Sequence, residues 1–228
     1  MLSIWVLSGF YFIKAKSSKI LQKTFLLNAI FSFSAFILYI VHLLLIYLDV
    51  GFEDWNFQNA MPYANVSPFM FAVSPLFLLL PKRVRKHCLN LISLLTIGMI
   101  ISPLISIIHN VVINYKYHAS FLLDYVPHLI FSIWGIYIIQ SKQVVLNIKS
   151  STISGSIIMC VALLMMILNV IFDQSFFGLS LNGKHSIYNQ KIVSNSYVSA
   201  LVYFLGLLII MIMGYLFHYF VIKINKKA

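Results

Sequence analysis

The hydrophobic positions of this chain fall in long, nearly uninterrupted stretches that short polar gaps separate. A bilayer has a hydrocarbon core of ~30 Å, which about 20 helical residues cross. Six stretches are long enough or nearly so, and they run over 24–48, 66–80, 88–109, 121–139, 153–172 and 197–222. Together with an earlier stretch, Met1 to Ile13, they predict an all-α transmembrane bundle of about seven spans. The whole chain, residues 1–228, then forms a single membrane domain.

The first stretch is shorter than the others. As a helix, Met1 to Ile13 would extend only about 20 Å. It is either a shortened first span or the inner part of a span whose outer half the sequence omits. No cleavable signal peptide is predicted, because no charged segment precedes the apolar residues.

The charged residues divide the gaps between stretches into two alternating kinds. All five acids lie in or beside one kind: Asp49, Glu53, Asp54, Asp124 and Asp173. Thirteen of the sixteen Lys and Arg lie in the other kind or in the C-terminal tail. Because short loops rich in Lys and Arg stay in the cytoplasm, seven spans place the N-terminus outside and the C-terminus in the cytoplasm.

Composition agrees with a membrane location. The chain is 61% hydrophobic and 9% charged, with a mean hydropathy of +0.94, whereas soluble domains carry about 25% charged residues. The net charge of +11 does not indicate nucleic-acid binding, because the basic residues are dispersed and no aromatic-basic platform accompanies them. Insertion and attraction to anionic lipid head groups explain them. Membrane lipids are therefore the expected partners, and a protein partner is left open.

Abundant Ile, Lys, Asn and Ser favour a bacterial source with an AT-rich genome. Helical spans then indicate the plasma membrane, because bacterial outer membranes hold β-barrels. No metal or cofactor is predicted, because neither a CxxC pair nor an HExxH or P-loop motif occurs. Cys88 and Cys160 are interpreted as reduced thiols without a role.

Polar residues at membrane depth are costly without partners, so they are the candidates for function. His128 lies early in the fourth long stretch, the fifth of the seven predicted spans, and an imidazole there could act as a general base or simply bond to a neighbouring helix. His42 and His109 could pair with it if the outer helix ends converge. Further candidates for an interior, outward-facing polar cavity are Asn65, Ser67, Ser74, Ser102, Ser106, Asn169 and Asp173.

The order of several short motifs resembles a known family. Met61 to Pro68 opens the second long stretch, a basic turn follows at 81–86, Ser102-Pro103 lies in the next, and Pro127-His128 heads the one after. This order is similar to that of the YwaF-type bacterial integral membrane proteins, which have seven spans.

The resemblance implies distant kinship to eukaryotic membrane acyltransferases, which are thought to use a motif Cys as nucleophile and a later His as base. The motif His position holds Ala64 and the motif Cys position holds Val66, so only His128 keeps the residue type. Ser67 is adjacent, and a Ser67–His128 pair is the remaining catalytic hypothesis.

Four functions therefore stay open at this point. The favoured one is a YwaF-like membrane protein with a lipid-related role and an outward-facing polar cavity, which is lined by His128, Asn65, Ser67, His109 and Asp173. Enzyme activity is left open and is not favoured, because Ala64 and Val66 replace the motif His and Cys. The second is a lipid acyltransferase or hydrolase that uses Ser67 and His128. The third is a small transporter, against which the lack of internal repeats argues. The fourth is an accessory or immunity-type membrane protein.

Overall fold

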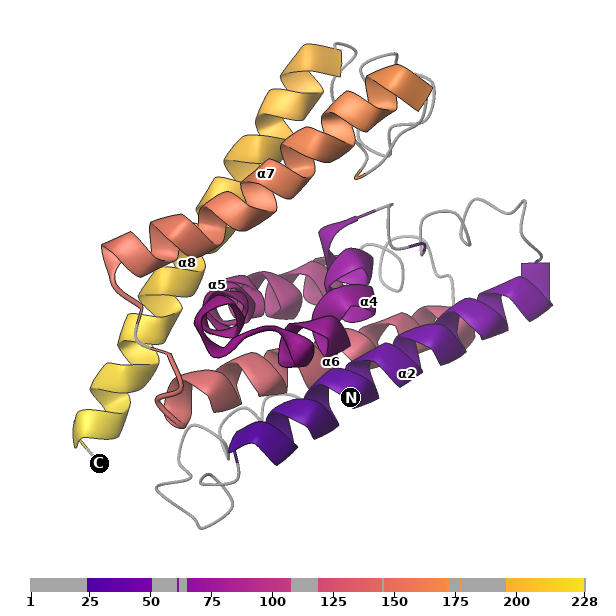
Figure 1. Ribbon diagram of the computed structural model, residues 1–228. Coiled ribbons are helices and arrows are strands. Elements are labelled where there is room, and N and C mark those ends of the chain that lie inside the picture. The colour runs from indigo at the N-terminus through magenta and orange to yellow at the C-terminus, as the bar shows by residue number, and fades with distance from the viewer. Residues whose placement is uncertain are drawn as a thin grey trace.

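The computed structural model describes residues 24–50, 61, 65–107, 119–144, 146–172, 177 and 196–227. This part of the chain is helical (Figure 1), and its helices are α2 (Thr24–Val50), α4 (Val66–Leu79), α5 (Lys82–Ile107), α6 (Ala119–Gln140), α7 (Ile148–Phe172) and α8 (Ser196–Lys227). The prediction of an all-α protein is confirmed. The stretch from Met1 to Ile13 lies outside the described residues.

Four of these helices, α2, α5, α7 and α8, are long and apolar enough to cross a membrane. The other two, α4 and α6, contain shorter apolar segments. Much of the apolar surface of α2, α7 and α8 is exposed, with Leu48 at 77% and Ile171 at 65%. Exposed apolar surface on this scale marks contact with lipid or with another protein. The fold therefore fits a multi-pass membrane protein, while the count of seven spans and the orientation remain predictions.

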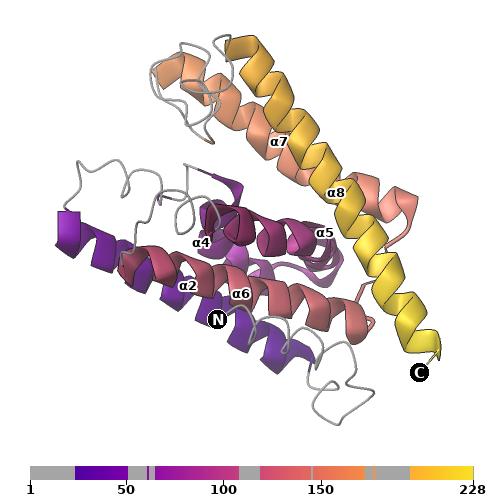
Figure 2. The ribbon, with the colours of Figure 1, turned by 180° about the vertical axis from the view of Figure 1, so that it is seen from behind.

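Helix α5 is the centre of the bundle. It packs against α6, α7 and α8, whereas α2 packs against α6 and α4. Figures 1 and 2 show α7 and α8 on the side of α5 away from α2. Consistent with this position, the α5 segment Lys82–Ile101 is the most buried of the four candidate spans.

Small residues allow the helices to cross closely where α5 meets its neighbours. A Cβ atom at Gly214 of α8 would overlap the backbone carbonyl of Leu94, and one at Gly135 of α6 would overlap the side chain of Thr96. Helices in membranes commonly associate through such small residues, because lipid tails supply no hydrophobic drive between them. Glycine at these two positions therefore fixes where α5 contacts α6 and α8.

Aromatic side chains fill the space between α2, α4 and α6. The Phe71 ring lies 6.0 Å from that of Tyr39 and 5.7 Å from that of Phe131, centroid to centroid. Phe131 in turn meets Trp134 edge to face at 5.5 Å. These distances suit aromatic pairs, which add about 0.5–1.5 kcal/mol each beyond the area that they bury. Phe71 thus joins all three helices.

Three helices extend further than the hydrophobic pattern predicts. Helix α5 begins at Lys82 rather than at 88, α7 begins at Ile148 rather than at 153, and α8 continues to Lys227 rather than ending at 222. All three extensions lie on the basic side. Lys and Arg favour helix, and they can keep their charged ends in water while their stems lie along apolar surface. Each helix therefore continues beyond its apolar stretch.

Side-chain caps set the start of α7. The Asn147 side-chain oxygen accepts from the Ser150 N–H at 2.8 Å, and the Ser150 hydroxyl oxygen accepts from the Asn147 N–H at 3.0 Å. This reciprocal pair satisfies two N–H groups that a helix start leaves free. Helix α6 ends at Gln140, and Lys142, two residues later, has a φ of 53°. The Gln143 N–H then donates to the Ile138 carbonyl, which is the hydrogen bond of a Schellman motif.

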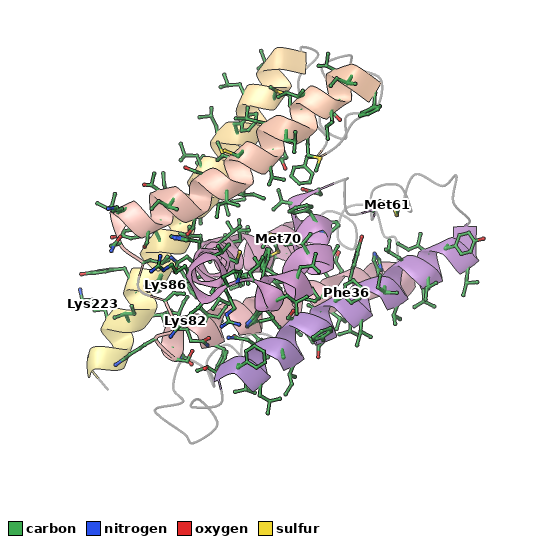
Figure 3. The ribbon with its side chains drawn as sticks, viewed as in Figure 1. Phe36, Met61, Met70, Lys82, Lys86 and Lys223 are labelled. Carbon is green, nitrogen blue, oxygen red and sulfur yellow. The ribbon has the colours of Figure 1, made fainter. Side chains whose placement is uncertain are left out.

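The basic gaps of the sequence meet at one end of the bundle, the basic end. The Arg85 guanidinium near the start of α5 lies 5.6 Å from the ring centroid of Phe25 near the start of α2. The α6–α7 connection reaches α2 through Gln143 and α8 through Leu146. Figure 3 shows Lys82, Lys86 and Lys223 at this same end.

The acidic helix positions lie at the opposite end, the acidic end. Asp49 is in the last turn of α2 and Asp124 in the second turn of α6. Because α2 begins and α6 ends at the basic end, both residues are a helix length away from it. Among the described residues, the two signs of charge thus lie toward opposite ends of the helices.

Candidate functional site

The start of α4 is shaped by its cap and its prolines. The Asn65 side-chain oxygen accepts from the Val66 N–H at 2.8 Å, so Asn65 is the N-cap. Pro75 lacks the N–H that would bond to the carbonyl four residues earlier, that of Phe71. The Ser74 hydroxyl donates to this carbonyl at 3.2 Å. The helix therefore continues past Pro75 and holds Phe71 in the core.

His128 of α6 lies against α4, and its side chain is 5% exposed. The Phe71 ring meets the imidazole edge to face, with centroids 4.8 Å apart and an angle of 87° between the planes. The Ser132 hydroxyl donates to the His128 backbone carbonyl at 2.7 Å, a bond within the same helix. The imidazole is therefore held in an aromatic setting between the two helices.

Other polar side chains lie at the same level, toward the acidic end. Ser67 is one turn before Phe71 on α4 and is half-buried, and His42 follows Tyr39 by three residues on α2. Tyr125 is one turn before His128 on α6 and is 7% exposed. Residues three or four apart share a helix face. His42, Ser67, Tyr125 and His128 are called the outer polar layer.

Of the five predicted site residues, Asn65, Ser67 and His128 lie in the described part of the chain. Ser67 lies one turn before Phe71 on α4, and the Phe71 ring contacts the His128 imidazole of α6 edge to face. The oxygen of Asn65 caps α4, so at least that atom serves the helix and not a cavity. His109 and Asp173 lie outside the described residues.

Two buried residues of interest are not among the candidates that the sequence indicates. Tyr125 is 7% exposed, and its spacing of three from His128 was the available signal. The His218 side chain is 2% exposed. Nothing in the local sequence marks it, because its partners come from other elements.

His218 joins α8 to two other elements at the basic end. Its Nε2 accepts from the Leu146 N–H at 3.5 Å, and its Nδ1 lies 3.2 Å from the Ser93 hydroxyl oxygen. Since Nε2 accepts, the neutral ring carries its proton on Nδ1 and donates to Ser93. These bonds give His218 a structural role between α5, α8 and the α6–α7 connection.

A second polar network at the basic end ties α2 to α6. The Trp134 indole N–H donates to the Asn28 side-chain oxygen at 2.8 Å, and the Asn28 amide nitrogen donates to the Gln143 oxygen at 2.5 Å. The Gln143 nitrogen donates to the Ser141 hydroxyl at 2.7 Å. The indole can only donate, so the Asn28 amide has one orientation that satisfies all its neighbours.

No group of three or more His, Cys, Asp or Glu able to hold a metal ion occurs in the part of the chain that the structure describes. Comparisons with known proteins give no match to any family model, curated protein or solved structure. The YwaF-type resemblance therefore remains a prediction from the motifs alone. The outer polar layer is the candidate site, on its own geometry.

Proposed function

We propose that the protein is a multi-pass protein of a bacterial plasma membrane that binds a lipid at its outer polar layer, without modifying it. Four helices suited to a membrane and the separation of charge support the location. One observation carries the binding role: the buried His128 imidazole is packed against Phe71 between α4 and α6, and the half-buried Ser67 lies one turn before Phe71 on α4. Ligand sites characteristically combine apolar and aromatic walls with a few polar groups.

The basic end faces the cytoplasm in this proposal, as the rule for positive loops requires. The outer polar layer then lies in the outer half of the membrane, where it is accessible to lipids of the outer leaflet. The YwaF-type resemblance points in the same direction, because it places a family histidine at His128.

Photocrosslinking tests the binding role. Cells that express the protein are given a phospholipid with a photoreactive acyl chain, and crosslinked lipid is measured on the purified chain. His128→Phe should reduce crosslinking several-fold, because phenylalanine fills the space without hydrogen-bonding groups. Ser132→Ala is the matched control: Ser132 is also buried on α6, but its hydroxyl only bonds back to its own helix. Equal crosslinking by all three proteins would contradict the proposal.

A catalytic alternative uses Ser67 as nucleophile and His128 as base. The position of Ser67 one turn from Phe71, on the helix that His128 faces, favours it. A lipophilic fluorophosphonate would then label Ser67, and the label would disappear in both Ser67→Ala and His128→Phe. If the protein still crosslinks lipid but the labelling of Ser67 does not depend on His128, the catalytic role is excluded and the binding role stands.

A further inference from the structure

Helix α5 contains a buried amide that the outer polar layer and the basic-end networks do not use. The Asn90 side chain is 1% exposed, and neither its oxygen nor its nitrogen has a hydrogen-bond partner among the described residues. A buried polar group without a partner costs about 1–3 kcal/mol. Because such groups are rare in folded proteins, each one calls for a ligand or another specific explanation.

The direction of Asn90 follows from its place on α5. Lys82, Lys86 and Asn90 are spaced four residues apart, so they form one row along the helix. Side chains on a helix lean toward its N-terminus. The Asn90 amide therefore points along the row toward Lys86 and the basic end. Both lysines are exposed, so the row leads from the surface into the interior.

Helix α8 packs against the same side of α5. One turn further along α5, Ser93 bonds to His218 of α8, and the Leu94 carbonyl approaches Gly214 of α8. At 100° per residue, Asn90 lies between these two positions around the helix axis. The row of Lys82, Lys86 and Asn90 therefore lies on the side of α5 that meets α8, and we call it the basic row.

The start of α5 favours an anion. Pro81 precedes the helix and offers no capping side chain, and the first helical bond runs from Arg85 N–H to the Pro81 carbonyl. The N–H groups of the first residues have no helical partner, and their dipoles attract negative charge. The first turn holds no acid. Phosphate groups bind at helix starts of this kind.

Neighbouring charges do not compensate the lysines of the basic row. The sequence contains no acid between Asp54 and Asp124 or after Asp173. Arg85 is already engaged, because its guanidinium donates to the Leu78 carbonyl at 3.1 Å and lies over Phe25. Lys82 and Lys86, together with the exposed Arg83, are thus cations at this helix start without a neighbouring acid in the sequence.

We propose that the basic row binds the phosphate of an anionic phospholipid, with Lys82 and Lys86 contacting the phosphate and the Asn90 amide bonding to the glycerol or ester oxygens beneath it. A lipid fits better than a soluble anion because the row starts at the end of α5, a helix long and apolar enough to cross a membrane, and phospholipid phosphates lie at the ends of such spans. The site depends on the membrane location and is independent of the outer polar layer.

The test compares thermal unfolding in two kinds of lipid nanodisc. One holds phosphatidylcholine alone, and the other holds equal parts of phosphatidylcholine and phosphatidylglycerol. The anionic lipid should raise the unfolding temperature of the parent chain. Lys86→Gln should weaken binding of phosphatidylglycerol about fivefold (about 1 kcal/mol) and remove most of this increase. Lys86 is exposed, so its replacement leaves the packing of the bundle unchanged.

Lys223→Gln is the matched control. It removes the same charge at the same end, but Lys223 is exposed and lies 140° around α8 from the buried His218. The Lys223→Gln chain should keep the increase in unfolding temperature that the anionic lipid causes.

Asn90→Leu should lose this increase. In phosphatidylcholine alone it should unfold at the parent temperature or above, because it removes an unpaired amide. If the anionic lipid raises the unfolding temperature of all variants equally, the effect comes from the general surface charge, and the proposal is overturned. An equal increase from soluble glycerol phosphate would overturn the assignment to a lipid.

Discussion

At the scale of single residues, Asn28 shows how one polar side chain orders a largely apolar bundle. Its amide links Trp134 of α6 to Gln143 of the α6–α7 connection, and it is 5% exposed. A hydrogen bond between membrane helices contributes about 0.6 kcal/mol on average, with ~1.7 kcal/mol as the upper range. The loss of Asn28 is costlier, because it leaves a buried donor and a buried acceptor unpaired at once.

Replacing Asn28 with leucine should therefore lower the free energy of unfolding by about 1–2 kcal/mol. Reversible unfolding in mixed detergent micelles, followed by circular dichroism, measures this change. A double-mutant cycle with Trp134→Phe isolates the bond, and the two replacements should couple by about 0.5–2 kcal/mol. Strictly additive effects would show that the Asn28–Trp134 bond contributes nothing to stability.

At the scale of helices, the crossing of α5 and α8 is set by the absence of a side chain. The backbone of α8 at Gly214 lies directly against the Leu94 carbonyl, so there is no space for a methyl group. Elsewhere on the same helix, Gly206 has open space around its Cα. Gly214 is therefore required by the close contact with α5, whereas the space around Gly206 would accept a side chain.

Alanine at these two positions should have opposite effects. Gly214→Ala forces α5 and α8 apart and should lower the free energy of unfolding by about 1–3 kcal/mol. Gly206→Ala removes only the flexibility of glycine and should raise that free energy by up to ~1 kcal/mol. The same unfolding assay compares the two. Equal effects of both replacements would contradict the close crossing at Leu94.

At the scale of the whole molecule, charge is sorted by end. The starts of α5 and α7, the end of α8 and Lys142 after α6 carry the described basic residues and lie by the start of α2, while Asp49 and Asp124 lie toward the far ends of their helices. Helices inserted by the positive-inside rule produce this arrangement. The basic end is therefore the one that we expect in the cytoplasm.

A labelling experiment in intact cells tests this orientation. In a chain with Cys88 and Cys160 replaced by serine, a cysteine at the exposed Lys142 position should react with a membrane-impermeant maleimide only after the cells are opened. A tag at the carboxyl terminus should behave in the same way. Reaction at either position in intact cells would invert the orientation and, with it, the side from which the outer polar layer is reached.

The sequence predicts the helices well because each one is encoded within its own residues. Long apolar stretches place all six described helices, and α4 begins at Val66 as the pattern predicts. The start of α7 was missed because it depends on a polar cap, Asn147 with Ser150, outside the apolar stretch. Hydrophobicity alone carries no information about such a cap.

The candidate site is harder to predict, because it depends on contacts between helices. The sequence indicates His128 through its depth in an apolar stretch, but not that Phe71 of α4 would pack against it. In the same way, His218 and Asn90 each have ordinary local sequences. Their burial follows from the position of α5 in the centre of the bundle, which no single segment encodes.

The dependence of α5 on α8 bears on how the chain is synthesised. Ser93 finds its bond partner, and the Leu94 carbonyl its close neighbour, on α8, which is synthesised after α5, α6 and α7. Until then, the central helix must wait in the translocation machinery or beside an insertion chaperone, with its polar side covered. A chain that terminates before α8 would expose that side to hydrocarbon, and quality-control proteases would recognise it as unfinished.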